Sequence, residues 1–418
     1  MKKMHMRAFV GGLLLLCVIV ANLTACTAKI DAKNLMKDVT PRRVDALYDI
    51  RSESAVITDF AIRLFQASEE NGKNTLISPL SVLAALAMTL NGADGQTRAQ
   101  IEAVLGMSAE ELNLYFYSYM DRISMAVASE LKLANSIWVT DAEDFTVEEN
   151  FLQINADYFD ADIYEAPFDQ TTLRDINNWV KRETDGMIAK LLDNISNDAV
   201  MYLINALAFE GEWLEPYKKP QVIDGEFTKE NGENQNVTYM YSEEGIYLED
   251  EMTKGFVKYY KGAKFAFVAL LPNEGISVSE YVASLTGSKV SSLLASGEYE
   301  CVHASIPKFS TEYEMSMLNV LGDMGITDAF DSALANFNRL GHSASGNLVI
   351  SEIYHKTSIT VDEAGTKASA ATSVEVNSRG MEPLEPKEVY LDRPFVYMLI
   401  DLRNNLPFFI GTVMEIEQ

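Results

Sequence analysis

The chain has 418 residues, of which 48% are hydrophobic and 10% aromatic, so it can bury a large core. Its 61 acidic residues outnumber its 34 basic ones, which gives a net charge of −27. This charge excludes a general affinity for nucleic acid, because binding phosphates requires a basic surface that releases counterions. It also argues against binding of heparin-like polymers or anionic lipids, except at a local basic patch.

The N-terminus has the pattern of a secretion signal. Lys2, Lys3 and Arg7 precede an apolar run over residues 8–23, and this order is typical of signal peptides. A transmembrane anchor is the alternative, but the run is short for a membrane span and is interrupted by glycine and asparagine. We therefore expect this segment to direct export.

The sequence LTAC, which ends at Cys26, resembles the signal of bacterial lipoproteins, in which the cysteine receives lipid and becomes the new N-terminus. We predict a lipoprotein signal peptide over residues 1–25, with plain secretion as the alternative. Cleavage there removes three positive charges and no negative ones, so the mature charge would be −30. The expected location is extracytoplasmic, at the cell surface or facing the periplasm, with a lipid on Cys26 as the membrane anchor.

Few residues of the mature chain could form disulfides or bind metal. Cys17 leaves with the signal and Cys26 would carry lipid, so Cys301 remains alone and an intramolecular disulfide is impossible. The histidines show no paired spacing, whereas metal sites usually combine several His or Cys ligands. We therefore expect no metal and no cofactor. The histidines of the mature chain are His303, His342 and His355.

The chain then divides into two parts. Residues 26–50 are polar and mixed in charge and contain Pro41, so we expect them to form a tether. Residues 51–418 contain no internal repeat and no low-complexity linker, and we predict a single domain over this range.

Helices are predicted mainly in the first half of this domain. Apolar residues recur at helical spacing from Val56 onward, and a second, apolar helix starts near Pro79 and runs to about Leu90, before the turn sequence NGADG. The sequence INNWVKRETDGMIAKLL predicts another amphipathic helix, with Gly186 at a turn.

Strands dominate the later part of the chain. The long apolar or alternating runs are typical of buried strands. They are VMYLINALAFEGEW, KFAFVALLP and PFVYMLIDLRNNLPFFIGTVMEI. Because helices and strands do not alternate regularly, the sequence predicts an α+β fold built on large sheets.

Two sequences approach serine-enzyme motifs. GHSAS at residues 341–345 lacks the final glycine of a nucleophile elbow and lies in a polar segment that we expect to be a loop. SIPK at residues 305–308 matches S-x-x-K, but Pro307 argues against the helix which that motif needs. A lipid-anchored serine hydrolase is therefore a weak alternative, and we expect no enzyme.

The stretch VDEAGTKASAATSVEVNSRGMEP, residues 361–383, combines strand and loop character. In a strand, alternate residues point to opposite faces. The uncharged face would comprise Thr366, Ala368, Ala370, Thr372, Val374, Val376 and Ser378. The opposite face would comprise Lys367, Ser369, Ala371, Ser373, Glu375 and Asn377. The flanking glycines are typical of exposed backbone, so the stretch is either an ordinary strand with a turn or a segment that can be both loop and strand.

A series of longer motifs occurs in order along residues 54–415. They are NTLISPLSV, ALAMTLNGADGQT, LANSIWV, INNWV with TDGMI, LINALAFEGEW, LLP, IPKF, LGDMGITDAF, ISEIYHKTSITVDEAGTKASAAT and RPFVYMLID with FFIGTV. In these motifs the sequence resembles the serpin family. The resemblance implies three β-sheets surrounded by about eight or nine helices, with an exposed reactive-centre loop near the C-terminus. It also implies a monomer that inhibits serine proteases.

In inhibitory serpins, the protease cleaves the reactive loop, which then inserts into the main sheet as a new strand while the acyl-enzyme persists. By resemblance, the reactive loop here is residues 361–383 and the bond that is cut is Arg379–Gly380. An Arg before the cut fits trypsin-like proteases, whose specificity pocket is anionic. The hinge residues that the resemblance implies are Glu363, Gly365, Thr366, Ala368, Ala370, Ala371 and Thr372.

The resemblance also implies residues that control opening of the main sheet. Ser78, Ser81, Asn205 and His355 match a polar cluster beneath it. Lys308 is expected to pair with Glu363 near Trp213, where insertion begins.

Three positions depart from the family pattern. Lys367 stands where the family usually has Glu, Ser369 interrupts a run of Ala, and Glu210 occupies a position that is commonly Lys. The first two would lie on the outward face of an inserted strand, which should tolerate them. A serpin that is only cleaved, or that serves as a binding scaffold, is the main alternative to an inhibitor.

Overall fold

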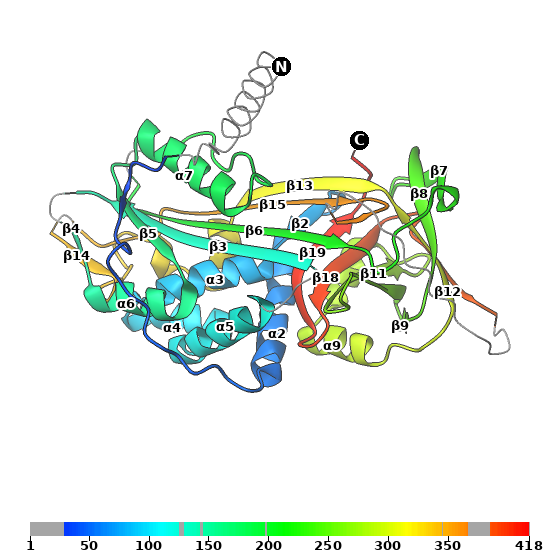
Figure 1. The fold of residues 1–418 in the computed structure, drawn as a ribbon, viewed down its shortest axis with the longest axis horizontal. Coiled ribbons are helices and arrows are strands. Elements are labelled where there is room, and N and C mark those ends of the chain that lie inside the picture. Colours follow the sequence, from blue (N-terminus) through cyan, green and yellow to red (C-terminus); the bar gives the residue numbers. More distant parts are fainter. Residues whose placement is uncertain are drawn as a thin grey trace, which may run out of the picture.

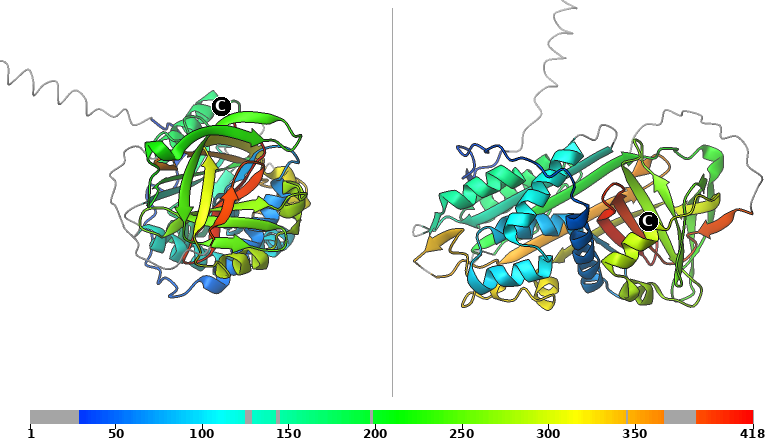
Figure 2. Two further views of the ribbon diagram at one scale, coloured as in Figure 1. Left: turned by 90° about the vertical axis from the view of Figure 1, so that its right-hand side faces the viewer. Right: turned by 90° about the horizontal axis from the view of Figure 1, so that it is seen from below.

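The computed structural model describes residues 29–124, 129–142, 145–196, 199–344, 346–366 and 385–417. A large sheet runs along the molecule, most helices lie below it, and two further sheets are gathered at one end (Figures 1 and 2). Within the described ranges, no helix is both long and apolar enough to span a bilayer.

The helices of the described residues carry the labels used in Figure 1. They are α2 (Arg51–Ser68), α3 (Pro79–Leu90), α4 (Gly95–Leu105), α5 (Ala109–Ser124), α6 (Glu149–Phe159), α7 (Gln170–Glu183), α8 (Val278–Ser284), α9 (Gly287–Ala295) and α10 (Leu318–Asp323), with 3-10 turns η1 (Lys219–Gln221) and η2 (Asp328–Phe330). α3 begins at Pro79, the Ser78 side chain accepts a hydrogen bond from Ser81 N, and every residue of the helix is buried.

Among the described residues, the main sheet has seven strands. In spatial order they are β1 (Lys33–Asn34), β5 (Asp162–Ala166), β3 (Ser129–Thr140), β6 (Met201–Glu212), β16 (Gly365–Thr366), β15 (Glu352–Val361) and β13 (Phe309–Ser316). β6 and β15 also pair directly with each other over part of their length.

Three smaller sheets complete the described fold. The six-stranded sheet contains β2 (Thr75–Ile77), β19 (Leu406–Val413), β18 (Phe395–Asp401), β11 (Phe265–Pro272), β10 (Thr253–Tyr259) and β9 (Tyr247–Glu249). The four-stranded sheet contains β17 (Lys387–Tyr390), β12 (Val302–Pro307), β8 (Asn234–Glu244) and β7 (Val222–Thr228). β14 (Gly341–Ser343) pairs with β4 (Phe145–Val147). The predicted α+β class is confirmed.

The central strands of the six-stranded sheet explain two of the three long apolar runs of the sequence. Every residue of β11, β18 and β19 is buried. Strands that are buried on both faces need no polar alternation. These two runs therefore form central strands of a covered sheet, and the third run, VMYLINALAFEGEW, contains β6 of the main sheet.

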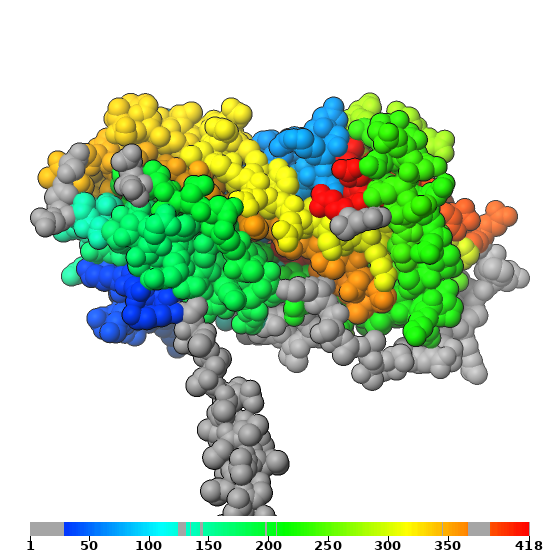
Figure 3. Space-filling model, turned by 90° about the horizontal axis from the view of Figure 1, so that it is seen from above, coloured from blue at the N-terminus to red at the C-terminus, as the bar shows by residue number. Residues whose placement is uncertain are grey.

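The segment expected to be a tether differs from the prediction in its described part, residues 29–50. β1 adds to the edge of the main sheet beside β5, and Asp175 of α7 accepts hydrogen bonds from the backbone of Asp31 and Ala32. Arg42 donates to Asp157 on α6. Figure 3 shows the segment in dark blue against the body. Its few apolar side chains are spaced too irregularly to predict this packing.

The first three residues of each enzyme-like motif lie in a short strand. Gly341–Ser343 form β14 rather than the loop expected for this segment, and no helix follows directly in the described residues. Ser305, Ile306 and Pro307 belong to β12. Neither serine lies at the strand-to-helix turn or helix start that its enzyme motif requires.

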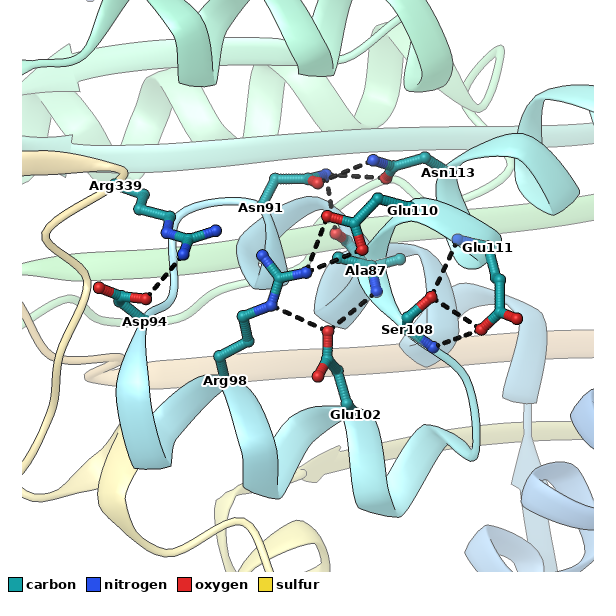
Figure 4. Close-up of polar contacts among 11 residues, drawn as sticks. Ala87, Asn91, Asp94, Arg98, Glu102, Ser108, Glu110, Glu111, Asn113 and Arg339 are labelled. Carbon is teal, nitrogen blue, oxygen red and sulfur yellow. Dashed lines mark hydrogen bonds and ion pairs between the residues drawn. The ribbon is translucent and has the colours of Figure 1, made fainter.

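A network of polar side chains joins α3, α4 and α5 (Figure 4). Asn91 and Asn113 are buried and exchange two side-chain hydrogen bonds of 2.9 and 2.8 Å. Arg98 of α4 donates to Glu102 and, through Nη2, to both carboxylate oxygens of Glu110 on α5. Because buried amides are costly to leave unpaired, this network fixes the packing of the helices beneath the main sheet.

Candidate functional site

The main sheet changes its pairing between β6 and β15. The two strands pair directly and in parallel from Tyr202 and Glu352 to Ala206 and Lys356. Beyond these residues the strands separate, and β16 lies between them, antiparallel to both. The structure thus contains a short strand at the open end of a sheet that is closed at its other end.

The opening preserves the register of the sheet. Thr366 of β16 pairs with Gly211 of β6 and with Val361 of β15. Where the strands touch, Asn205 pairs with His355. The residue numbers differ by 150 in both cases, so β6 and β15 separate without slipping along each other. A strand that continued β16 would therefore meet both neighbours in one register.

Thr366, the first inward-facing residue of β16, is buried and packed against Tyr260. Thr366 is 2% exposed, and its Oγ1 lies 2.5 Å from the hydroxyl oxygen of Tyr260. At Gly365, an added Cβ would lie 2.0 Å from the carbonyl oxygen of Gly211. A side chain at residue 365 is therefore incompatible with this close approach of the two backbones.

The turn that leads into β16 is held by Trp213. The backbone N of Trp213 donates to the carbonyl of Ala364 at 2.9 Å, and its indole Nε1 donates to the carbonyl of Asp362 at 2.8 Å. The Asp362 carboxylate accepts hydrogen bonds from the backbone N of Ala364 and of Gly365. Trp213 also stacks on Tyr260, with ring centroids 4.5 Å apart. One aromatic pair thus supports both the turn and Thr366.

The ion pair implied between Lys308 and Glu363 is present. Lys308 Nζ lies 2.5 Å from Glu363 Oε2, and both side chains are partly exposed. The hydrogen bond from Lys308 lowers the pKa of Glu363 below its usual value. Because Lys308 directly follows β12, the pair ties the turn before β16 to the end of β12.

The polar cluster implied beneath the sheet is also assembled. Ser78 N donates to Nε2 of His355 at 3.1 Å, and the Asn205 amide donates to Asn135 on β3. His355 is 2% exposed, and burial lowers its pKa to about 3. The imidazole is therefore neutral, and it lies where β6 and β15 touch directly.

Several predicted residues lie outside the described part of the chain. These are Cys26, Ala368, Ala370, Ala371, Thr372, Arg379 and Gly380. The structure places the other predicted residues in two groups, one around β16 and one around His355.

The sequence analysis did not identify two residues that hold β16 in place. Tyr260 closes over Thr366, and Asp362 caps the turn. Asp362 could have been found, because an Asp three residues before a Gly is typical of such turns. Tyr260 gives no local signal, because its role depends on contacts with distant residues.

A sheet that is open between two of its strands, with a third strand starting in the gap, defines the class of protein to which this chain belongs. The family described as "Serpin (serine protease inhibitor)" matches residues 55–416. The chain is therefore a member of the serpin family, and its three large sheets and surrounding helices form the serpin fold.

Two solved structures and one curated relative illustrate the similarity. The thermophilic serpin tengpin in its native state is 47% identical, with a TM-score of 0.88, covering 92% of this chain and all of that one. Tengpin in its latent state gives 45% identity and a TM-score of 0.78, covering 90% and 100% of the two chains. Leukocyte elastase inhibitor A of Mus musculus is 30% identical over 86% of this chain and 98% of its own length.

His355 makes the stability of the fold depend on pH. Its folded pKa is about 3, whereas an unfolded histidine titrates near 6.5, so only the unfolded state gains this proton between these values. The stabilisation that depends on the neutral imidazole is complete above the unfolded pKa and is lost on acidification. The free energy of unfolding then falls with a slope that approaches about 1.4 kcal/mol per pH unit. Urea midpoints measured from about pH 7 to about pH 5.5 should fall in the parent protein and fall less in His355→Gln.

The control for this experiment is His342→Gln, because the His342 side chain is 59% exposed. This variant should keep the parent's pH dependence. Equal slopes in the parent and in His355→Gln would show that the buried imidazole does not cause the effect.

Proposed function

We propose that this serpin is a suicide inhibitor of trypsin-like serine proteases, which cut its reactive loop at Arg379–Gly380. The freed strand then continues β16 into the main sheet before the acyl-enzyme is hydrolysed. The position of β16 between β6 and β15 carries this proposal. It supplies the first two residues of such a strand in the register that the rest would need.

The neighbours of the missing strand match the composition of the loop. In the same register, residue 368 would lie between Phe209 and Ile359, and residue 370 between Leu207 and Thr357. These four neighbours are all buried. Because these buried neighbours already fill the space, positions 368 and 370 can hold only small side chains. The sequence has Ala at both positions.

The register also brings Thr372 to the polar cluster. It would separate Asn205 from His355, which pair with each other in this structure. Asn205 Oδ1 is buried and has no hydrogen-bond partner among the described residues. A threonine hydroxyl is a small donor that could satisfy such an acceptor.

The hinge composition favours an inhibitor over a non-inhibitory serpin. A loop that is only cleaved does not need small inward-facing residues. Residues 366–372 nevertheless contain no bulky side chain and no proline, and their one charged residue is Lys367.

The test is incubation of the protein with trypsin, followed by a denaturing gel. The parent should form a covalent band near the summed masses, whereas Arg379→Ala should form none because the specificity pocket loses its guanidinium partner. Cleavage without a covalent complex would support the non-inhibitory alternative. Complexes cut at a bond other than Arg379–Gly380 would show that the assigned register is wrong.

Loop insertion can be separated from tight binding by changing the first inward residue. Thr366→Arg would place a charge where the side chain is 2% exposed, at a cost of several kcal/mol unless the charge is paired. Deacylation should then be faster than insertion, so trypsin should cut the Arg379–Gly380 bond and remain active. The matched control Lys367→Arg alters the outward row and should still inhibit. Full trapping by Thr366→Arg would exclude insertion as the mechanism.

In this register, the unusual residues Lys367 and Glu210 would form a complementary pair once the loop inserts. Extending β16 by one residue puts residue 367 beside Glu210, which is only partly buried. Opposite charges directly across a sheet stabilise it modestly, and like charges destabilise it. We therefore propose that the two departures from the family pattern compensate each other when the loop inserts.

A charge-reversal cycle tests this pair. Glu210→Lys and Lys367→Glu should each raise the amount of inhibitor consumed per trypsin about two- to fivefold, because each puts like charges together. The double variant should return close to the parent value. If the increase in inhibitor consumed per trypsin in the double variant equals the two single increases combined, the residues do not meet in the inserted state.

We also propose that the protein is anchored outside the cytoplasm by a lipid on Cys26. The LTAC sequence and the apolar run before it support this anchor. When the protein is expressed in a bacterium, the parent should partition into the detergent phase, and Cys26→Ala should be released or remain unprocessed. A mature N-terminus at another residue would contradict the anchor, and Arg379→Ala should partition as the parent does.

A further inference from the structure

Three metal-binding side chains meet on the four-stranded sheet. Cys301 and His303 are separated by one residue at the start of β12, so they point to the same face. Glu243 of β8 lies directly opposite His303, with 3.6 Å between its Oε1 and the imidazole Nε2. A thiol, an imidazole and a carboxylate oxygen thus lie within 4.8 Å of one another.

We propose that Glu243, Cys301 and His303 bind a divalent transition metal ion, with zinc as the best match. Zinc takes sulfur, nitrogen and oxygen ligands together, and donors around one tetrahedral ion are about 3 to 4 Å apart. Glu243 and Cys301 are exposed and His303 is half-buried, so small rotamer changes can bring the donors together. Calcium and magnesium prefer oxygen ligands alone, so the thiolate and imidazole disfavour them.

The surroundings leave the fourth coordination position open. Glu243 and His303 also line a cavity of about 1080 Å³ that reaches Trp213 and Tyr217. Three protein ligands plus a water from such a cavity are typical of an accessible zinc site. On the other side of His303, Glu388 of β17 pairs with it across the sheet, and its carboxylate accepts a hydrogen bond from the Tyr390 hydroxyl.

The expectation of no metal rested on the histidines alone. On a strand, Cys-x-His is a paired spacing, because residues two apart share a face. The third ligand comes from β8, about 60 residues earlier in the chain, and its proximity depends on the pairing of β8 with β12. This inference does not depend on the proposed protease inhibition.

The site can be tested by titrating the metal-free full-length protein with cobalt(II), which reports a thiolate ligand through a near-ultraviolet charge-transfer band. The parent should show this band, and zinc should abolish it by displacement. Cys301→Ser should lose the band, and His303→Gln should weaken cobalt binding about tenfold or more. Zinc should also raise the thermal midpoint of the parent but not that of Cys301→Ser, because it binds the folded site.

The matched control is His342→Gln. His342 Nε2 lies 3.3 Å from Glu148, so it is also a histidine beside a carboxylate, but no cysteine completes a metal cluster with it in the described residues. This variant should bind cobalt as the parent does. Absence of the band in the parent, its survival in Cys301→Ser, or equal weakening by His342→Gln would each overturn the proposal.

Discussion

The separation of β6 from β15 is the constraint on which the rest of the site depends. Backbone groups that face a gap in a sheet need partners. Direct pairing supplies them up to Ala206 and Lys356, and β16 supplies them again at Gly211 and Val361. Trp213, Tyr260 and the ion pair between Lys308 and Glu363 all act on the turn that delivers β16 to this place.

The same gap explains why the hinge has such restricted residues. Gly365 lies against the backbone of Gly211, where a Cβ cannot fit. Thr366 is small enough to be covered and polar enough to contact the Tyr260 hydroxyl. At the end of the direct pairing region that borders the gap, the neutral imidazole of His355 accepts a hydrogen bond from the Ser78 backbone N–H at the start of α3. Helix α3 is thus tied to β15, one of the two strands that would have to part.

The sequence predicted the local elements well where one pattern dominates. The helix that starts at Pro79 and the buried strands β6, β11, β18 and β19 follow from apolar runs and capping residues. Family motifs indicated Trp213, Lys308, Glu363 and His355. The contribution of Tyr260, the packing of residues 29–50 and the pairing of Glu243 with His303 could not be predicted, because each depends on contacts between distant parts of the chain. Short polar segments such as β14 carry too little pattern to distinguish a strand from a loop.

The packing of residues 29–50 changes what a lipid on Cys26 would do to the molecule. A free tether of that length would let the protein swing far from the membrane. Here the chain is already attached to the body at β1 and at α7. Only three peptide units separate Cys26 from residue 29, a reach of about 10 Å at full extension. An anchored protein would therefore be held close to the bilayer in a restricted orientation.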